Sequence, residues 1–279
     1  MVGNRADLGK GRQMPVHYGS RDLNISTVSS PLGTQIPNAS GAGYNYRING
    51  QDRIAVTYFG EGAASEGDFH PGLNFAATLR SQALFICRNN GYAISTPIDD
   101  QYAGDGIAPR GVAYGMPTIR VDGNDLLAVS IATKKARELI IKEKRPVLLE
   151  TMSYRGGDHS SSDASATYRN EKEMQKWTQY LESLGDPIAR FETFLLGRKL
   201  IAADYQKEVR QQALQEVRAA LKSATDQPRP PIDEMFSDVY ESVPAHIAEQ
   251  KEALKAHLRK YPDQYRLEQY EDGAQWPNK

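Results

Sequence analysis

The sequence predicts an α/β fold, in which helices flank a parallel sheet, followed by a helical carboxy-terminal region. Short apolar runs of strand character alternate with helix-length segments as far as residue 153, and strands separated by helices form right-handed parallel crossovers. From residue 171 onward the apolar residues follow a helical period. The 279 residues suffice for one large α/β domain with an appended helical region.

The elements of the α/β region can be assigned in order after a loop-like start. Helices are expected at residues 33–48, 65–80 and 125–144, and strands at 53–59, 83–88, 117–122 and 147–153. A loop over 89–116 is expected to separate the second and third strands. Small residues predict that the first helix packs closely on the sheet. Ser65 and Asp68 are placed like a capping pair for the second helix. The Asp122-Gly123-Asn124-Asp125 turn ends in a plausible N-cap for the third, and we interpret it as structural.

The remaining chain is expected to form a loop, several helices and a tail. Residues 155–170 are polar and rich in Gly, Ser and Asp, which predicts an exposed, mobile loop. Helical segments follow, with breaks at residues 185–187 and at the stiff, proline-rich residues 227–231. Another helix is expected over 244–259. Three tyrosines in the tail favour either the core of a terminal hairpin or an intersubunit surface, namely Tyr261, Tyr265 and Tyr270.

Two domains are therefore expected. Residues 1–170 would form the α/β domain, ending in a regulatory loop at 155–170, and residues 171–279 the helical region and tail. The 34 Lys and Arg residues and 35 Asp and Glu residues give a net charge of −1 without a basic stripe, which argues against nucleic acid as a partner. No apolar run is long enough to span a bilayer. The single cysteine, Cys87, is interpreted as a core thiol.

Two strand ends carry the residues that point to chemistry. Gly60-Glu61-Gly62 follows the first strand, and Arg88-Asn89-Asn90-Gly91-Tyr92 ends the second. Both turns are expected at the carboxyl edge of one sheet, where open α/β sheets bind ligands. Gly60 and Gly62 let the backbone pass close to a phosphate, and a helix starting near Ser65 would attract an anion to its N-terminus.

Glu61 predicts a magnesium ion between the two turns. A carboxylate beside a diphosphate is repelled unless a cation separates them. Mg²⁺ takes oxygen ligands from few carboxylates and from phosphate, water and neutral carbonyls. The amide oxygen of Asn90 and a backbone carbonyl near Tyr92 are suitable neutral ligands, and Arg88 suits phosphate oxygens. One Gly-x-Gly turn is usually ordinary, but the pair matches the thiamine diphosphate motif in order and spacing, with Glu where Asp is commoner.

The two turns belong to a longer set of segments that resembles one enzyme family. The chain is similar to the α subunit of the decarboxylating component of 2-oxo acid dehydrogenase complexes at residues 11–19, 29–32, 59–67, 74–77, 88–97, 154–169 and 236–240. Glu61 and the Gly-Arg-Gln-Met-Pro segment at 11–15 resemble the branched-chain members, whereas the pyruvate enzyme usually reads Gly-Ser-Met-His there. The resemblance covers essentially the whole chain and implies the thiamine diphosphate-binding fold.

The resemblance implies a set of ligand contacts. Magnesium ligands are implied at Glu61, Asn90 and Tyr92. Thiamine diphosphate contacts are implied at Ser30, Leu32, Gly60, Glu61, Gly62, Ala63, Arg88, Asn90, Tyr92, Ile94 and His159. A potassium site that braces the cofactor loop is implied at Ser29, Pro31, Thr34 and Gln35. Taken alone, the sequence of residues 29–35 is typical of a turn followed by the start of a helix.

The polar loop carries a catalytic and a regulatory candidate. The resemblance implies that His159 reaches the active centre, where it orients the reacting group or takes part in acyl transfer to lipoate. Ser160 occupies the position of the family's inhibitory phosphorylation. A phosphate there would repel Asp158 and Asp163 and compete for Arg155, which disorders a loop rather than ordering it.

The implied activity is oxidative decarboxylation of the branched-chain 2-oxo acids derived from valine, leucine and isoleucine, of the 3-methyl-2-oxobutanoate dehydrogenase type. The resemblance implies a β subunit in an α2β2 heterotetramer, a lipoyl-bearing transacylase core that accepts the acyl group, and a regulatory kinase and phosphatase. The alternatives are an α subunit of pyruvate or acetoin dehydrogenase, or a truncated, non-catalytic form that binds the β subunit or the kinase.

The amino terminus leaves the compartment open. Residues 1–10 resemble neither a signal nor a transit peptide, and the family normally has a substantial segment before the Gly-Arg-Gln-Met-Pro region, so we expect that this sequence starts late. Resemblance to the eukaryotic enzyme implies the mitochondrial matrix, with bacterial cytoplasm as the alternative.

Overall fold

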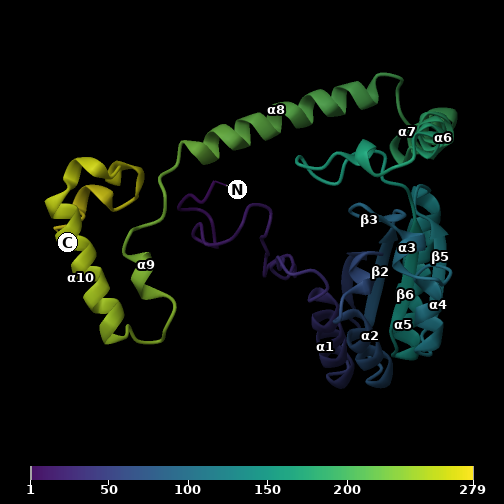
Figure 1. Cartoon of the computed structure of the whole chain (residues 1–279), viewed down its shortest axis with the longest axis horizontal. Helices are drawn as coiled ribbons and strands as arrows, with labels where there is room; N and C mark the ends of the chain where they lie inside the picture. The colour runs from purple at the N-terminus through teal and green to yellow at the C-terminus, as the bar shows by residue number, and fades with distance from the viewer. Residues whose placement is uncertain (1, 279) are drawn as a thin grey trace. The chain divides into compact units, whose positions relative to one another are not determined.

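A computed structural model describes residues 2–278, apart from the side chains of residues 183 and 184 (Figure 1). The chain divides into two compact units. Residues 29–203 form one unit, and the residues up to 28 together with those from 204 onward form the other. This division rests on contacts within the chain, and the domain boundary expected at residue 170 stays a prediction.

A four-stranded parallel sheet is the centre of the unit formed by residues 29–203. Its strands are β1 (Ala55–Gly60), β2 (Ala83–Asn89), β5 (Thr118–Asp122) and β6 (Val147–Met152). They are arranged in the order β1-β2-β6-β5, and all three pairings are parallel. The predicted α/β class is therefore confirmed. In the β1–β2 register Gly60 lies opposite Arg88, so the two turns singled out in the sequence start side by side.

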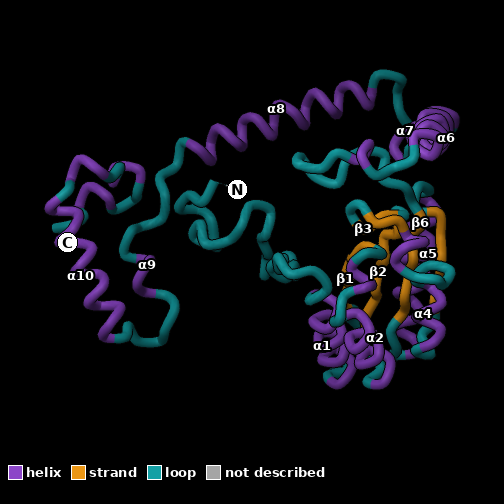
Figure 2. Tube along the Cα trace, viewed as in Figure 1, coloured by secondary structure: helices purple, strands orange, loops and turns teal. Residues whose placement is uncertain are grey.

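Helices cover both faces of this sheet (Figure 2). Side chains alternate between faces along a strand, and in β2 Phe85 and Cys87 pack into one cluster while Leu84 and Ile86 pack into the other. The first cluster includes residues of α1 (Gln35–Ile48) and α2 (Phe69–Thr78), and the second includes residues of α5 (Leu126–Glu143). Burial of each large aliphatic or aromatic side chain contributes about 1.5–3 kcal/mol. This packing holds the carboxyl edge of the sheet in place.

The helix expected from residue 65 begins later, and the capping pair does not form. Ala63–Ser65 is a single 3₁₀ turn (η1), and α2 begins at Phe69 without a side-chain hydrogen bond from its N-cap, Asp68. Pro71 explains the late start, because proline is tolerated in the first helical turn but excludes a helical residue four positions earlier. By contrast, the predicted N-cap Asp125 accepts a hydrogen bond from the Ala128 amide at 3.0 Å.

The segment expected to be a loop over 89–116 contains short elements. The antiparallel pair β3 (Tyr92–Ala93) and β4 (Thr96–Pro97) is followed by α3 (Ile98–Gln101) and α4 (Ala108–Ala113). The loop at 155–170 contains the 3₁₀ turn η2 (Ser165–Thr167). After the loop, this unit ends with α6 (Glu171–Tyr180), a π-helical turn η3 (Leu181–Gly185) and α7 (Pro187–Gly197). The predicted break at residues 185–187 lies between the last two elements.

The other unit contains the remaining helices and the tail. The helices are α8 (Tyr205–Thr225), α9 (Glu234–Ser237) and α10 (Ala245–Lys260), followed by 3₁₀ turns η4 (Pro262–Gln264), η5 (Leu267–Gln269) and η6 (Gly273–Gln275). The tail is therefore not a hairpin. Tyr270 packs against a cluster of Ile232, Leu258 and Trp276, whereas Tyr265 is 44% exposed. Between residues 2 and 278, no helix has the length and apolar character needed to cross a membrane.

Two of the segments that carry the family resemblance meet in this unit. Arg12 Nη1 and Lys10 Nζ lie 2.6 and 2.8 Å from Asp238 Oδ2, and Arg12 also donates to the carbonyl of Glu234. The hydrogen bonds from Arg12 and Lys10 lower the pKa of Asp238 to about 2. The amino-terminal segment is thus tied to α9 and the residue that follows it.

This ion-pair cluster predicts an acid-dependent contribution to stability. Because the folded-state pKa of Asp238 is below its ordinary value of 3.8, the contribution is complete above pH 3.8 and is lost as the pH falls through about 2. We expect Asp238→Asn to lower the free energy of unfolding at pH 7, and the deficit to shrink below pH 4. Urea unfolding followed by fluorescence of Trp276, in a Trp177→Phe background, measures this. The exposed residue Asp263 supplies the control variant Asp263→Asn, and a deficit independent of pH would contradict the assignment.

Candidate functional site

The carboxyl ends of β1 and β2 bring Glu61 and Asn90 together. The backbone amide of Asn90 donates to Glu61 Oε2 at 3.1 Å. This contact joins two turns that follow neighbouring parallel strands, and it lies at the sheet edge where ligands bind in open α/β folds. The predicted proximity of these two residues is confirmed.

The Glu61 carboxylate is buried with one of its oxygens unsatisfied. The residue is 1% exposed, and Oε1 has no hydrogen-bond partner within residues 2–278. Burial raises the pKa of Glu61, and backbone hydrogen bonds from the Asn90 turn oppose this only in part. A buried carboxylate oxygen without a donor is costly in isolation. A cation at Oε1 would satisfy it, so this atom fits the predicted metal.

The neighbouring turn supplies neutral oxygens. Asn90 Oδ1 accepts a hydrogen bond from the Tyr92 amide at 3.1 Å, and Asn89 Oδ1 accepts one from the Gly91 amide at 3.1 Å. Gly91 has φ of +88°, a conformation that favours glycine. An amide oxygen has a second lone pair, so Asn90 Oδ1 retains capacity for a cation.

The described residues contain no cluster of acidic, histidine or cysteine ligands for a metal. Within residues 2–278, no group of three or more His, Cys, Asp or Glu side chains is placed to hold an ion. A metal at Glu61 would therefore take most of its ligands from neutral oxygens, water and the phosphates of a second ligand. That is the ligand set Mg²⁺ prefers when it binds with a phosphorylated substrate or cofactor.

Gly62 allows the turn after β1 to pack closely against Ala93, in the segment that follows β2. A Cβ at Gly62 would lie 2.6 Å from the Ala93 Cβ, whereas one at Gly60 would approach only the Arg88 carbonyl, at 4.0 Å. Phosphate contacts for these glycines and for Ala63 stay predictions. The helix expected to start near Ser65 begins at Phe69 instead, because Ala63–Ser65 is one short turn, and anion binding at its N-terminus stays a prediction.

Several predicted contacts lie around these turns. Arg88 and Ile94 are exposed, and Ile94 has φ of +56°. Thr34 Oγ1 donates to the Pro31 carbonyl at 3.3 Å, and Gln35 Nε2 donates to the Tyr58 carbonyl at 3.1 Å. The predicted potassium segment thus reaches β1 through Gln35. The other predicted residues of this segment are exposed, namely Ser29, Ser30, Pro31 and Leu32.

His159 and Ser160 lie on the exposed loop expected at 155–170. The backbone amide of His159 donates to Asp163 Oδ2 at 2.7 Å, and the Ser160 hydroxyl lies 3.4 Å from that of Ser162. No hydrogen bond or ring contact within residues 2–278 joins the His159 side chain to Glu61 or Asn90. The catalytic assignment of His159 therefore stays a prediction.

A cluster of buried and half-buried side chains joins the start of α6 to the turn at residues 89–92, here called the metal turn, and no pattern in the sequence indicated it. Glu173 accepts from the hydroxyls of Tyr92, at 2.9 Å, and Tyr154, at 3.4 Å. Burial and this hydrogen bond raise the pKa of Tyr92 to about 12. The guanidinium of Arg169 lies over both tyrosine rings, 4.8 and 5.2 Å from their centres. Tyr154 also stacks on Trp177.

The same cluster spans both ends of the loop. Tyr154 precedes the loop and Arg169 is near its end, and Arg169 Nη1 donates to the Arg155 carbonyl at 2.7 Å. Arg155 Nη2 in turn donates to the Ile94 carbonyl beside the metal turn at 2.7 Å. No spacing rule links Glu173 to Tyr92, which are 81 positions apart.

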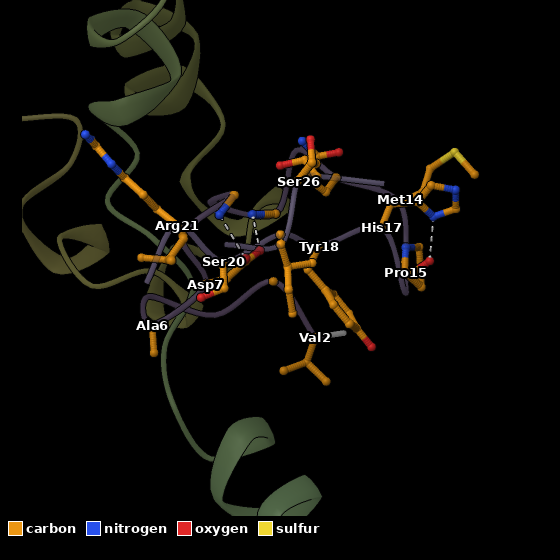
Figure 3. A pocket seen from close by; sticks show the side chains of 18 residues that line it. Val2, Ala6, Asp7, Met14, Pro15, His17, Tyr18, Ser20, Arg21 and Ser26 are labelled. Carbon is orange, nitrogen blue, oxygen red and sulfur yellow. Dashed lines mark hydrogen bonds between the residues drawn. The ribbon is translucent and has the colours of Figure 1, made fainter. Parts of the chain in front are cut away.

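The cavities of the described chain include one at the candidate site and one away from it. A cavity of about 810 Å³ follows the edge of β2, β5 and β6 and is lined by Asn90, Tyr92 and Trp177 among others. A second, of about 830 Å³, is formed by loops of residues 2–27 (Figure 3). None of the predicted site residues lines the second cavity.

The chain is similar to known proteins over most of its length. Residues 1–233 match a family model described as "Dehydrogenase E1 component". The chain is 49% identical over 269 residues to "2-oxoisovalerate dehydrogenase subunit alpha, mitochondrial" of Macaca fascicularis, covering 96% of this chain and 60% of that protein. The proteins of the same description from Homo sapiens and Dictyostelium discoideum are each 48% identical, with the same coverage. The chain thus spans about 60% of the length of these relatives.

The unsatisfied Glu61 carboxylate predicts that the site is destabilising without a cation. Burial raises the folded-state pKa of Glu61 above its ordinary value of 4.5. The free energy of unfolding therefore falls as the pH rises from 4.5 to the folded-state pKa, and below pH 4.5 the carboxyl group costs no stability. We expect Glu61→Gln to increase the free energy of unfolding of the ligand-free chain by about 1 kcal/mol at pH 7. The gain should disappear near pH 4. Urea unfolding at both pH values measures it, with the exposed Glu66→Gln as control, and a loss of stability at pH 7 would contradict it.

Proposed function

This chain belongs to the dehydrogenase E1 component family, and we propose that it forms the α half of an enzyme that oxidatively decarboxylates branched-chain 2-oxo acids. Membership of the family implies thiamine diphosphate as the cofactor. The observation that carries the proposal is the buried, unsatisfied Glu61 Oε1 beside the Asn90 turn. The relatives described as 2-oxoisovalerate dehydrogenase subunits support the branched-chain substrate class. The chain spans about 60% of their length, so the activity is proposed for an assembled enzyme.

The residues at the two turns suit a Mg²⁺-diphosphate group. Glu61 Oε1, Asn90 Oδ1 and the Tyr92 carbonyl would hold the metal. The diphosphate and its linker would lie against residues Ser30, Leu32, Gly60, Gly62, Ala63, Arg88 and Ile94. When bound, thiamine diphosphate supplies a nucleophilic carbon that adds to the 2-oxo group and accepts the electron pair left by carbon dioxide.

The protein's own contribution is positioning and charge. Glu61 offsets part of the metal charge, and the exposed guanidinium of Arg88 is free to approach phosphate oxygens as a bidentate donor. A potassium ion held by Ser29, Pro31, Thr34 and Gln35 would brace the segment before α1. His159, on the loop at 155–170, would face the reacting centre and orient the acyl group for transfer to lipoyl-lysine.

Exposed apolar side chains support the need for a partner subunit. Helix α8 has no buried residue, and it exposes Val209, Leu214, Val217 and Leu221 by 44–64%. Contiguous exposed apolar surface marks interaction sites. We assign this surface to binding of a β subunit in an α2β2 assembly. The assembled enzyme would transfer the acyl group to a lipoyl-bearing transacylase core. The relatives' descriptions name the mitochondrion, and we propose the mitochondrial matrix for this chain.

Regulation at Ser160 by a kinase and phosphatase is part of the proposal. Hydrogen bonds from Ser165 lower the pKa of Asp158, and those from the His159 amide and Tyr168 lower the pKa of Asp163. Both carboxylates are therefore ionised at neutral pH, on either side of Ser160. A phosphate on Ser160 would meet two negative charges and would draw Arg155 away from the Ile94 carbonyl.

Cofactor binding tests the metal site. We expect Glu61→Ala and Asn90→Ala to abolish Mg²⁺-dependent binding of thiamine diphosphate to the chain assembled with its β subunit, because each removes a metal ligand. Isothermal titration calorimetry with and without Mg²⁺ measures this, and Glu66→Ala and Asn74→Ala are controls at exposed positions. Near-normal cofactor binding by both site variants would contradict the assignment of Glu61 and Asn90 as metal ligands. Assembly with only weak cofactor binding by the unaltered chain would instead identify a non-catalytic form.

Substrate preference tests the branched-chain assignment. The assembled enzyme should turn over 3-methyl-2-oxobutanoate and 4-methyl-2-oxopentanoate at least about tenfold faster than pyruvate, measured as kcat/KM, because a pocket of branched-chain size gains apolar burial only from the longer substrates. A preference for pyruvate or acetoin would move the chain to the corresponding α subunit.

The effect of charge at Ser160 is measurable without the kinase. In Ser160→Glu, we expect faster amide hydrogen exchange across residues 155–170 than in the unaltered chain, because the added charge repels Asp158 and Asp163. Ser161→Glu is the matched control, since it adds the same charge one position further along the same loop. Equal exchange in both variants would show that the effect does not depend on position 160.

A further inference from the structure

A second buried carboxylate lies beneath the candidate site, and the proposed chemistry does not use it. Glu150, in the centre of β6, is fully buried. Its Oε1 accepts hydrogen bonds from Asn89 Nδ2 and the Ile107 amide, and its Oε2 accepts from the Ala108 amide and Arg120 Nε, each at 2.9 Å. A carboxylate with four donors has its lone pairs occupied. Glu150 is therefore not available as a metal ligand, in contrast to Glu61.

The surrounding chain is shaped to reach this carboxylate. A Cβ at Gly106 would lie 2.7 Å from Glu150 Oε1 and 3.2 Å from Oε2, and Gly106 has φ of +70°. Only glycine allows the backbone before α4 to approach so closely. Burial alone would raise the pKa of Glu150, but the hydrogen bonds from Asn89, the two amides and Arg120 outweigh it and hold the pKa below its ordinary value. The group is therefore ionised at neutral pH and accepts from all four donors.

One of the four donors leads directly to the metal turn. The Asn89 side chain, 1% exposed, donates to Glu150 through Nδ2 and accepts from the Gly91 amide through Oδ1. Its carbonyl also accepts from the Ser153 amide at 2.7 Å. Asn89 is thus fixed at three atoms. The next residue, Asn90, donates its amide to Glu61.

We propose that Glu150 is a positioning residue for the metal turn, which holds Asn89 so that Asn90 stays opposite Glu61. The inference rests on the proposed role of Glu61 and Asn90 as metal ligands. Glu150 acts on the metal only through Asn89 and the Asn90 turn. Groups that orient metal ligands in this way typically change metal affinity by about 10- to 100-fold when they are removed.

The test compares two ways of breaking this chain of contacts. Glu150→Gln replaces one acceptor oxygen by an NH₂ group that must face two donors. Asn89→Ala leaves the other three donors of Glu150 in place. It removes the Asn89 side chain together with its hydrogen bonds to Glu150, to the Gly91 amide and to the Tyr102 hydroxyl. The control is Asp105→Asn, which alters the 83%-exposed partner of Arg120 and spares the contact between Arg120 and Glu150.

Two readouts are measured on the full chain. In the absence of cofactor and metal, hydrogen exchange of the amides at residues 89–92 should be about tenfold faster in Glu150→Gln and Asn89→Ala than in Asp105→Asn. In the chain assembled with its β subunit, calorimetric titration with Mg²⁺ in the presence of thiamine diphosphate should give an apparent Kd about tenfold higher in the first two variants.

The possible outcomes separate this inference from the proposed function. If Asn89→Ala and Glu150→Gln exchange and bind Mg²⁺ like the control, Glu150 is a structural residue only and the inference is overturned. If Glu150→Gln does not fold, exchange and Mg²⁺ binding by Asn89→Ala like those of the control still overturn the inference, because Glu150 is proposed to act only through Asn89. If the unaltered chain binds no Mg²⁺, the proposed function fails, and the inference, which rests on it, fails as well. The exchange data then show only whether Glu150 orders the turn.

Discussion

The hydrogen bond between the Asn90 amide and the Glu61 carboxylate connects the two parts of the candidate site. It joins residues 29 positions apart in the chain, and it forms only because β1 and β2 pair in parallel with Gly60 opposite Arg88. A shift of this register by one residue would separate the turns and invert the faces of the strand. The two apolar clusters on either side of the sheet hold that register. The functional geometry is therefore a consequence of core packing.

Two buried carboxylates near the carboxyl edge of the sheet have opposite electrostatic environments. Glu150 is surrounded by four donors and its pKa is lowered, whereas Glu61 has one unsatisfied oxygen and its pKa is raised. Glu150 stabilises the fold, whereas Glu61 lowers the stability of the chain until a cation binds. This division is typical of functional sites, which retain local strain while the surrounding structure compensates. It also explains why Glu61, rather than Glu150, is the candidate metal ligand.

The sequence allowed the sheet and both turns to be predicted, because they follow from local patterns. Apolar runs located the strands, and Asp125 was identifiable as an N-cap by its turn. Pro71 indicates the late start of α2, and the prediction of a helix from residue 65 did not take this proline into account. Glu150 and Glu173 had no such local signal. Their roles depend on partners 61 and 81 positions away, and only the folded chain brings these together.

Anomalous diffraction from Mn²⁺, used in place of Mg²⁺, would test the account most directly. The experiment requires crystals of the chain assembled with its β subunit and thiamine diphosphate. The predicted result is a single manganese peak at this sheet edge, about 2.1 Å from Glu61 Oε1, Asn90 Oδ1 and the Tyr92 carbonyl. A metal bound elsewhere, with Glu61 Oε1 still without a partner, would contradict the account.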